Sequence, residues 1–327
     1  MAASSLFSAS EMNDETNNAA ADDNPASTSA QALDLLVESL RSEHGNAINA
    51  ILYYGSCLRN DDPFDGIVDS YLLTDSYRAV YPGRMRAILN WLLPPNVFYR
   101  ELAVGDRTLR VKYNVVSIES LRRGVSSRRV HSYFWGRLAQ PMKFLWSRDE
   151  NAKRNVEQLL EQAVKTFLER VLPRVPPSGS VCDLWTQGLG MSYAAELRSE
   201  APDRARQLVN HALEHYVEVT RQVASSLRFS LQVTGSGESA RYEAAVPSLR
   251  RVLGFWGWAV RRLVGKVLSL ARLFKALLTF EGGLDYAAWK LARHSGQPID
   301  IPDRVRRYPL IFVWPLLWKL YRRGIIR

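Results

Sequence analysis

Two short segments, AILYYGS at residues 50–56 and IVDSYLL at residues 67–73, decide the fold predicted for this chain. Their apolar, β-branched and aromatic residues are typical of buried strands, and a turn or a polar loop ends each of them. A third strand, LRVKYNVVS at residues 109–117, follows a turn at Gly105-Asp106. Apolar residues at helical spacing predict helices around these strands, at residues 31–44 and 85–93. Residues 31–147 are therefore expected to form a domain of α+β class with a mixed sheet.

The rest of the chain divides into four further regions. Residues 1–30 carry five acids and lack Lys and Arg, which predicts a disordered acidic tail. Residues 148–234 contain an amphipathic helix at 151–171 and then mostly helical patterns, so we expect a smaller helical domain. The glycines of residues 235–248 predict a flexible linker. Residues 249–327 form a basic C-terminal region.

Positive charge is concentrated in that C-terminal region. The 327-residue chain has a net charge of +10, but from residue 248 onward there are 16 Lys and Arg against 4 Asp and Glu, and the preceding 247 residues sum to −2. An enzyme that acts on nucleic acid usually spreads a basic groove over its body. This distribution instead favours a protein with no nucleic-acid partner that is tethered by its tail to an anionic surface.

Other compositional features exclude several classes of protein. Two cysteines, Cys57 and Cys182, cannot form a disulfide scaffold or a four-cysteine zinc site. No apolar stretch reaches the ~20 residues that a transmembrane helix needs. The acidic N-terminal segment resembles neither a mitochondrial nor a secretory signal, which favours a bacterial protein. We therefore expect a peripheral protein on the cytoplasmic face of the cell membrane, without a cleaved targeting signal.

The Gly-Ser turn and the aspartate on the next strand point to phosphate chemistry. Gly55 allows backbone amides to approach a triphosphate, and the Ser56 hydroxyl can hold its oxygens. Asp69, helped by Asp65, can hold the Mg²⁺ that neutralises those phosphates. Such a pattern is typical of nucleotidyltransferases, although the usual second acid, two residues further on, is Tyr71 here. An ordinary strand that ends in a tight turn beside a solvated acidic loop explains the same residues, so the motif alone leaves both interpretations open.

Five short motifs occur in a fixed order between residues 50 and 220. They are YGS at 54–56, VD at 68–69, VKYNVVS at 111–117, WGRLAQPMK at 135–143 and MSYAAELR at 191–198. Together they resemble the mitochondrial-type phosphatidate cytidylyltransferases, the translocator assembly and maintenance family of CDP-diacylglycerol synthases. The resemblance implies a nucleotidyltransferase domain followed by a helical, winged-helix-like domain. It also implies a reaction in which CTP and phosphatidate give CDP-diacylglycerol and pyrophosphate with Mg²⁺ as the cofactor.

The resemblance also implies roles for individual residues. Tyr54, Gly55, Ser56 and Arg198 would bind the nucleotide, and Asp69 would bind the metal. The catalytic set would be Asp69, Lys112, Arg137, Lys143 and Glu196. Structural alternatives stay open for several of these residues, since Lys112 could face solvent on its strand and Arg198 could pair with Glu196 or Glu200.

Four positions depart from the family pattern. Cys57, Asn114 and Ala195 each stand where the family has glycine, and Glu196 stands where it has aspartate. The change from aspartate to glutamate lengthens a candidate metal ligand by one methylene group. The family's motif also has a single aspartate on the second strand, so the resemblance is consistent with Tyr71 at the position of the usual second acid.

The C-terminal region has the pattern of a membrane-binding helix. On a helical wheel of residues 249–280, seven basic residues share one arc and Trp256, Leu263 and Phe274 lie in the opposite one. Such a helix lies in the membrane interface, where anionic lipid attracts each charge by ~1 kcal/mol. A second apolar segment, residues 308–318, carries Trp314 and Trp318 and could enter one leaflet. The predicted membrane-binding residues are Arg250, Arg251, Trp256, Arg261, Arg262, Lys266, Arg272, Lys275, Trp314 and Trp318. Alternatively, these helices pack on the body of the protein or on a partner protein.

The sequence thus favours a peripheral-membrane cytidylyltransferase with CTP, phosphatidate and an anionic membrane surface as its partners. The first alternative is a nucleotidyltransferase-fold enzyme that modifies another acceptor, a protein or a small molecule, at the membrane. The second is a non-catalytic membrane scaffold that keeps the fold without the chemistry. Whether the chain forms a homo-oligomer stays open.

Overall fold

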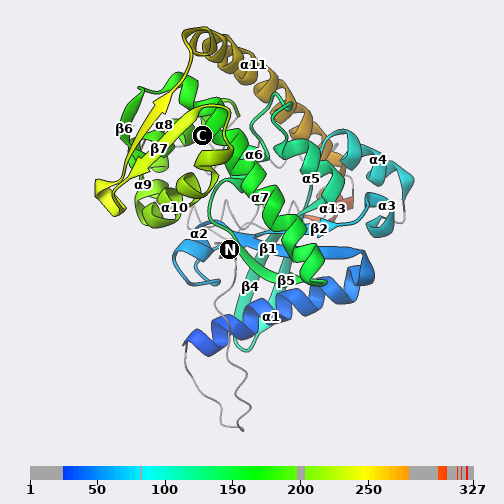
Figure 1. The fold of residues 1–327 in the computed structure, drawn as a ribbon. Coiled ribbons are helices and arrows are strands. Elements are labelled where there is room, and N and C mark those ends of the chain that lie inside the picture. Colours follow the sequence, from blue (N-terminus) through cyan, green and yellow to red (C-terminus); the bar gives the residue numbers. More distant parts are fainter. Residues whose placement is uncertain are drawn as a thin grey trace.

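The computed structural model describes residues 25–81, 83–196, 203–279 and 301–307, together with Pro315, Trp318 and Arg322. Its centre is a five-stranded mixed sheet in the order β3-β4-β2-β1-β5 (Figure 1). β2 and β4 are parallel, whereas the other three neighbouring pairs are antiparallel. The strands are β1 (Ile48–Tyr54), β2 (Val68–Thr74), β3 (Asn96–Val104), β4 (Arg107–Ser117) and β5 (Lys143–Ser147). This arrangement confirms the predicted α+β class with a mixed sheet.

Helices cover both faces of this sheet. α1 (Pro25–His44) packs below it in Figure 1, where Leu36 and Leu40 join a core with Ile51 and Leu72. The other face is covered by α5 (Ile118–Val125), α6 (Trp135–Leu138) and α7 (Glu150–Val171). Three short helices complete this half: α2 (Ser56–Arg59), α3 (Tyr77–Val80) and α4 (Arg84–Leu92). Because α1 begins at Pro25, the last residues of the segment predicted to be disordered are helical.

The second half contains a small sheet that the helical prediction missed. Its order is β6-β8-β7, from β6 (Ser178–Ser180), β7 (Ser230–Thr234) and β8 (Arg241–Ala245). The helices between β6 and β7 are α8 (Val181–Ala194), α9 (Arg204–His211) and α10 (Leu213–Val223). The expected flexible linker at 235–248 is therefore wrong, since β8 lies within it and pairs with both other strands.

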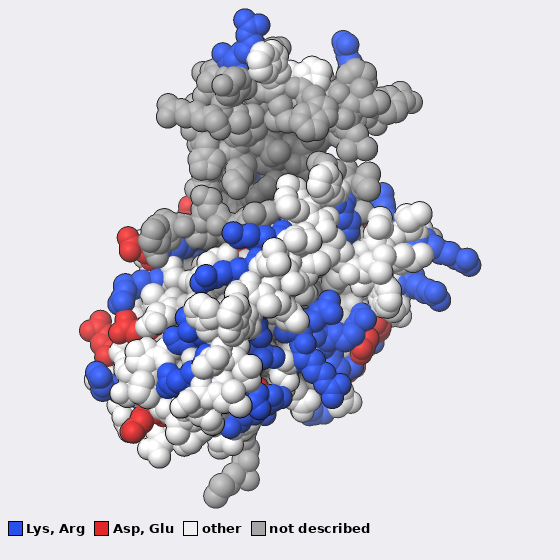
Figure 2. Space-filling model, turned by 90° about the horizontal axis from the view of Figure 1, so that it is seen from above, with Lys and Arg blue, Asp and Glu red and all other residues white. Residues whose placement is uncertain are grey.

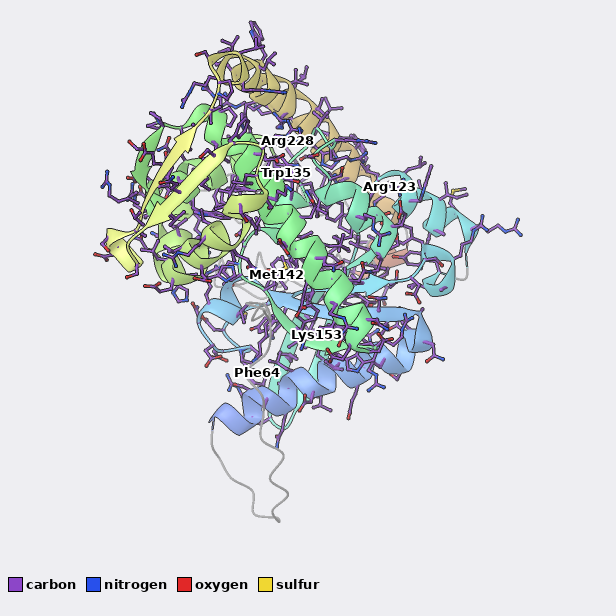
Figure 3. The ribbon with its side chains drawn as sticks, in the orientation of Figure 1. Phe64, Arg123, Trp135, Met142, Lys153 and Arg228 are labelled. Carbon is purple, nitrogen blue, oxygen red and sulfur yellow. The ribbon has the colours of Figure 1, made fainter. Side chains whose placement is uncertain are left out.

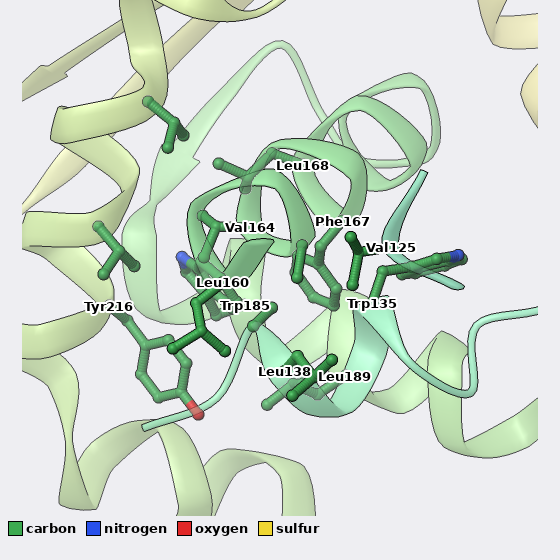
Figure 4. Close-up of a cluster of buried hydrophobic side chains, with 14 of the residues drawn as sticks. Val125, Trp135, Leu138, Leu160, Val164, Phe167, Leu168, Trp185, Leu189 and Tyr216 are labelled. Atoms are coloured by element: carbon green, nitrogen blue, oxygen red, sulfur yellow. The ribbon is translucent and has the colours of Figure 1, made fainter. Parts of the chain in front are cut away.

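One hydrophobic core joins the central sheet to this second half. Leu52 and Tyr71 from the sheet belong to the same buried cluster as Phe167, Trp185 and Tyr216. Figure 4 shows the aromatic centre of the cluster, where the Phe167 and Trp185 rings stack 4.5 Å apart and Trp185 lies 4.6 Å from Tyr216. The two halves are thus held together by continuous packing, in which residues of α6 and α8 share one core with residues of β1 and β2.

The long helix α11 (Ser248–Thr279) crosses the top of the molecule in Figure 1. Several of its basic side chains are turned toward the body of the protein. Trp258 is buried against Trp135, and its Nε1 donates to the carbonyl oxygen of Arg170 at 2.9 Å. Arg272 donates to the carbonyl of Pro94 at 3.0 Å, and Lys275 donates to that of Pro95 at 2.6 Å. Buried cations of this kind are stabilised by carbonyl oxygens, which supply the hydrogen bonds lost from water.

This packing corrects part of the membrane-binding prediction. Arg261 and Lys275 are each only 6% exposed, and Arg251 and Arg272 are engaged with backbone carbonyls, so none of the four is presented to a lipid surface. Arg250, Arg262, Lys266 and Trp256 are exposed, as is Trp318, whereas Trp314 lies outside the described residues. The roles of the exposed residues stay predictions.

The outward face of α11 is apolar. Its exposed large side chains are Leu249, Val252, Leu253, Phe255, Trp256, Val260, Leu263, Val267, Leu270, Leu273 and Phe274. Figure 2 looks onto this side of the molecule, where Lys and Arg border a white band and most Asp and Glu lie toward its margins. Among the helices in the described ranges, none is long and apolar enough to cross a bilayer. A further short helix, α13 (Asp303–Arg307), follows.

Candidate functional site

The predicted turn and aspartate lie side by side. β1 and β2 pair with Tyr54 opposite Asp69, so the residue after Tyr54 reaches the aspartate. Gly55 has φ of +100°, which disfavours any residue with a Cβ. A Cβ at Gly55 would also lie 3.1 Å from Asp69 Oδ2. Glycine is therefore required here twice, by backbone conformation and by the close approach of the aspartate.

Asp69 is held by a lysine on the neighbouring strand. The parallel register of β2 and β4 places Lys112 directly beside Asp69, and Lys112 Nζ forms an ion pair with Asp69 Oδ1. Both side chains are about one quarter exposed, at 26% and 23%. Lys112 is thus neither a solvent-facing residue nor a free cation. It orients the carboxylate and neutralises part of its charge.

Arg137 and Glu196 form a bidentate ion pair between the two halves of the protein. The guanidinium of Arg137, on α6, donates to the two carboxylate oxygens of Glu196 at 2.6 and 2.5 Å. It also donates to the Tyr133 carbonyl at 2.9 Å and stacks 3.9 Å from the Tyr133 ring. Burial alone would lower the pKa of Arg137, but the Glu196 carboxylate raises it well above its usual value. Arg137 therefore stays charged, and Glu196 is its positioning partner.

A cavity of about 350 Å³ opens between these elements. Gly55, Ser56 and Asp69 line one wall, and Arg137 with Gln140 and Pro141 lines the next. The second half of the protein closes the cavity with Tyr193, Arg204, Leu208, His211, Ala212 and Tyr216, and Tyr54, Leu58 and Arg59 complete the lining. Three arginines face a single lining carboxylate among the described residues, so the cavity favours an anionic ligand.

Two of these arginines were missed by the sequence analysis. Arg59 is the last residue of α2, three positions after Ser56, and Arg204 is the first residue of α9. Burial, followed by repulsion from Arg204, lowers the pKa of Arg59. Two cations held this close in a partly buried site are stabilised by an anion between them. The spacing of Arg59 after Ser56 was a usable signal, whereas nothing near Arg204 in the sequence links it to the turn.

Other predicted residues lie away from the cavity. Lys143 is an exposed residue of β5 whose register partner is Tyr53, on the face of the sheet opposite to Tyr54. Asp65 is exposed in the loop before β2 and accepts a hydrogen bond from Asn60 at 2.7 Å, so it does not line the cavity with Asp69. Arg198 lies outside the described residues. The structure thus brings together the turn, Asp69 and Arg137 and leaves Lys143 and Asp65 out.

Two residues that differ from the pattern the sequence resembles, Asn114 and Cys57, lie next to the turn. Asn114 Nδ2 donates to the Tyr54 hydroxyl at 3.0 Å and to the Ser70 carbonyl at 3.1 Å, so it fixes the tyrosine at the cavity wall. Burial, then the nearby Tyr71 and Asp69, raises the pKa of Tyr54 well above its usual value. Burial also raises the pKa of the Cys57 thiol to about 11. Tyr54 therefore stays neutral, and Cys57 is not a reactive thiolate near neutral pH.

The residues at this site suit a metal ion that takes one ligand from the protein and the others from substrate phosphates and water. In the part of the chain that the structure describes, no three His, Cys, Asp or Glu residues are grouped as metal ligands. Asp69 supplies one carboxylate, and its Oδ2 faces the turn at Gly55. Mg²⁺ is commonly held by one or two carboxylates together with substrate phosphates and water. One carboxylate beside an anion-binding wall fits that mode, and it does not fit a self-contained metal centre.

Comparison with known proteins gives little beyond this geometry. No family model matches the chain, and no curated protein matches it in sequence. Among solved structures, it is similar to a nucleotidyltransferase-like protein from Exiguobacterium sibiricum 255-15. The identity is 12%, the alignment covers 91% of this chain and 92% of that chain, and the TM-score is 0.27. A superposition at this level carries no argument about the function of this chain.

Proposed function

We propose that this protein is a nucleotidyltransferase whose nucleotide binds in the cavity between the central sheet and α9. The observation that carries the proposal is the contact between Gly55 and Asp69 in a cavity that Arg59, Arg137 and Arg204 also line. A triphosphate needs cations and hydrogen-bond donors around its oxygens and a carboxylate for its metal. The Ser56 hydroxyl, the three guanidinium groups and Asp69 are groups of those kinds.

Within this proposal, Asp69 would hold Mg²⁺, which would neutralise charge on the phosphates when bound. Lys112 fixes the carboxylate of Asp69 through their ion pair, and Glu196 fixes the guanidinium of Arg137 in the same way. Preorganised charges of this kind lower the barrier because they need not reorient as charge develops. No protein nucleophile is required if the acceptor is itself a phosphate.

We propose phosphatidate as that acceptor and CTP as the nucleotide. An oxygen of the lipid phosphate attacks the α-phosphorus of CTP, the new P–O bond forms CDP-diacylglycerol, and pyrophosphate leaves with the bond electrons. Two features support this assignment beyond the motifs. The exposed apolar face of α11 suits a lipid surface. From α7 onward the order is α7, β6, α8, α9, α10, β7, β8, which apart from the additional helix α9 is that of a winged helix, the domain that the resemblance implies.

A turnover assay tests the proposal with a matched pair of carboxylate variants. Purified protein is given labelled CTP, Mg²⁺ and phosphatidate vesicles, and CDP-diacylglycerol is measured. We expect turnover by the wild type, a loss of about 100-fold or more in Asp69→Asn, and near-normal turnover in Asp65→Asn. Equal turnover in the wild type and Asp69→Asn would remove Asp69 from the site. Activity with another nucleotide or acceptor, and none with phosphatidate, would contradict the proposed substrates but would still be consistent with nucleotide binding in this cavity.

A further inference from the structure

A second, separate cavity of about 220 Å³ lies beneath the first half of α11. Its walls come from the end of α7, from the segment before β7 and from α11 itself. Figure 3 labels Arg228, which lines this cavity, in the region where α7 approaches α11. The described residues that line the two cavities have no member in common. This cavity is therefore a different site from the one proposed for the nucleotide.

Four arginines line this second cavity, and one carboxylate faces them. The arginines are Arg170, Arg228, Arg250 and Arg261, and the carboxylate is Glu169. Glu169 is already engaged by Arg228, through an ion pair of 3.4 Å between Nε and Oε2 and a hydrogen bond of 3.3 Å from the backbone N–H. The other three arginines therefore leave a strong excess of positive charge in a confined space.

Arg261 is the most deeply placed of these cations. It is only 6% exposed, and within the described residues its Nε has no hydrogen-bond partner. Nε of Arg170 is also buried without one. Burial, then repulsion from Arg170, lowers the pKa of Arg261 to about 10. A buried guanidinium with an unused donor is costly until an acceptor is supplied, and an anion supplies one together with the opposite charge.

Two glycines of α11 shape this cavity. A Cβ at Gly254 would lie 2.8 Å from Pro173 Cβ, so glycine allows the helix to approach the end of α7. A Cβ at Gly257 would lie 2.7 Å from Arg261 Nη1, so glycine also leaves room for the guanidinium beside its own helix. Leu253, half exposed on the apolar face of α11, lines the mouth of the same cavity.

We infer that this cavity binds a phosphate group, with Arg170, Arg250 and Arg261 as its ligands. Guanidinium groups match phosphate oxygens with paired hydrogen bonds, and three of them around one cavity provide more donors than a chloride ion could use. The phosphate could belong to a membrane lipid headgroup, since the apolar face of α11 borders the opening, or to a free phosphate-bearing anion. The inference goes beyond the proposed function and does not depend on it.

Thermal unfolding in inorganic phosphate tests this inference. The melting temperature is compared in phosphate and in chloride at equal ionic strength for the wild type, Arg261→Met and Arg262→Gln. Arg262 is the matched control, because it is the exposed neighbour on the same helix. We expect phosphate to raise the melting temperature of the wild type and of Arg262→Gln by about 2–5 °C more than that of Arg261→Met. The nucleotide cavity is intact in all three proteins, so stabilisation by phosphate bound there is common to them, and the difference between the variants reports on the second cavity.

The same experiment separates a ligand from a structural role. In phosphate-free buffer, Arg261→Met should melt at or above the wild-type temperature, because the variant removes a buried, repelled charge. If that variant does not fold, Arg250→Gln replaces it, since Arg250 is exposed and lines the cavity. A phosphate shift in Arg261→Met, or in Arg250→Gln, that equals the shift in Arg262→Gln would overturn the inference. So would a wild type that phosphate stabilises no more than chloride does.

Vesicle binding distinguishes the two sources of the phosphate. Sedimentation with vesicles of phosphatidylcholine, with and without phosphatidylglycerol, is measured for the same variants. A lipid headgroup ligand predicts that Arg261→Met loses more of the extra binding to anionic vesicles than Arg262→Gln, which loses only the attraction of one exposed charge. Vesicle binding by Arg261→Met that is at least as strong as that by Arg262→Gln, together with a smaller phosphate shift in Arg261→Met, assigns the site to a free anion.

Discussion

Gly55 and Asp69 constrain each other's positions in the candidate site. The positive φ of Gly55 turns the chain out of β1, and the turn leaves only 3.1 Å between Asp69 Oδ2 and the place that a Cβ on residue 55 would occupy. Phosphate-binding turns need this kind of backbone exposure, because a side chain at the turn would occupy the place of the ligand. The backbone conformation of Gly55 and the position of Asp69, the candidate metal ligand, therefore depend on each other.

Replacing Gly55 by alanine should damage both stability and binding. We expect Gly55→Ala to lower the free energy of unfolding by about 1–3 kcal/mol and to weaken CTP binding, because it adds backbone strain and displaces Asp69. Gly105→Ala is the matched control, since Gly105 has φ of +59° but nothing within 4 Å of its Cβ position. Urea unfolding and CTP titration measure the two effects. If Gly105→Ala weakened CTP binding equally, the contact with Asp69 would be irrelevant.

Glu196 should matter chiefly through Arg137. Its side chain is 8% exposed and that of Arg137 is 11% exposed, so removal of the carboxylate leaves a buried, uncompensated cation. We expect Glu196→Gln to cost about 3–5 kcal/mol of unfolding free energy. The exposed pair of Glu218 and Arg221 provides the control, and Glu218→Gln should cost less than about 1 kcal/mol. Similar costs for the two variants would contradict the positioning role of Glu196.

His131 should make the protein sensitive to acid. Burial, then repulsion from Arg272, Arg129 and Arg137, lowers the pKa of His131 to about 3. Between about pH 6.5 and 3 the unfolded chain binds a proton that the folded protein does not, so stability falls as the pH is lowered through this window. By pH 5 the loss from this residue should reach about 2 kcal/mol. Urea midpoints measured from pH 7 to 5 should fall less steeply in His131→Gln, and parallel profiles would be the contrary result.

At the scale of elements, the sequence predicted those parts of the fold whose pattern is local. β1 is mostly apolar, β2 and β4 each contain an apolar run, and α4 and α7 have clear helical spacing, so all five are predicted from the sequence. β3 was missed because charged residues such as Arg100 and Glu101 interrupt its apolar pattern. β6, β7 and β8 were missed because they have three to five residues each and depend on pairing across the second half.

In the candidate site, too, residues that are close in the sequence could be predicted and residues that come from distant elements could not. Gly55, Ser56 and Asp69 come from neighbouring strands, and their spacing was enough to expect their contact. Arg204 and His211 enter the cavity from α9, more than a hundred residues later in the chain, so only the packing of the two halves reveals them. The burial of the Lys275 and Arg272 side chains could not be predicted for the same reason, because the carbonyl groups that they contact lie far away in the sequence, at residues 93–95.

The apolar face of α11 should determine binding to membranes. We expect the double variant Trp256→Ser and Leu263→Ser to bind anionic vesicles at least about tenfold more weakly, because both side chains are more than 60% exposed and would lose their burial in lipid. Leu35→Ser is the control, since Leu35 is an exposed apolar residue of α1, on the opposite side of the sheet (Figure 1). Vesicle sedimentation measures binding, and equal binding by both variants would assign the membrane contact to another surface.

At the scale of the whole molecule, the basic residues behind the net charge of +10 fall into three groups. Some C-terminal cations, such as Lys275 and Arg272, hold α11 to the body, whereas Arg262 and Lys266 are exposed beside its apolar face. Arg59, Arg137 and Arg204 instead converge from both halves of the chain on the first cavity. The proposed function thus depends on the two halves packing as one unit, with the cavity between them.

A crystal structure of the protein with CTP and Mg²⁺ is the most direct test of the proposed nucleotide site. We predict triphosphate density in the first cavity, in contact with Ser56 and with at least two of Arg59, Arg137 and Arg204, and a metal ion on Asp69. Nucleotide density elsewhere on the molecule, or a triphosphate that leaves the Gly55 turn and Asp69 untouched, would contradict the proposal.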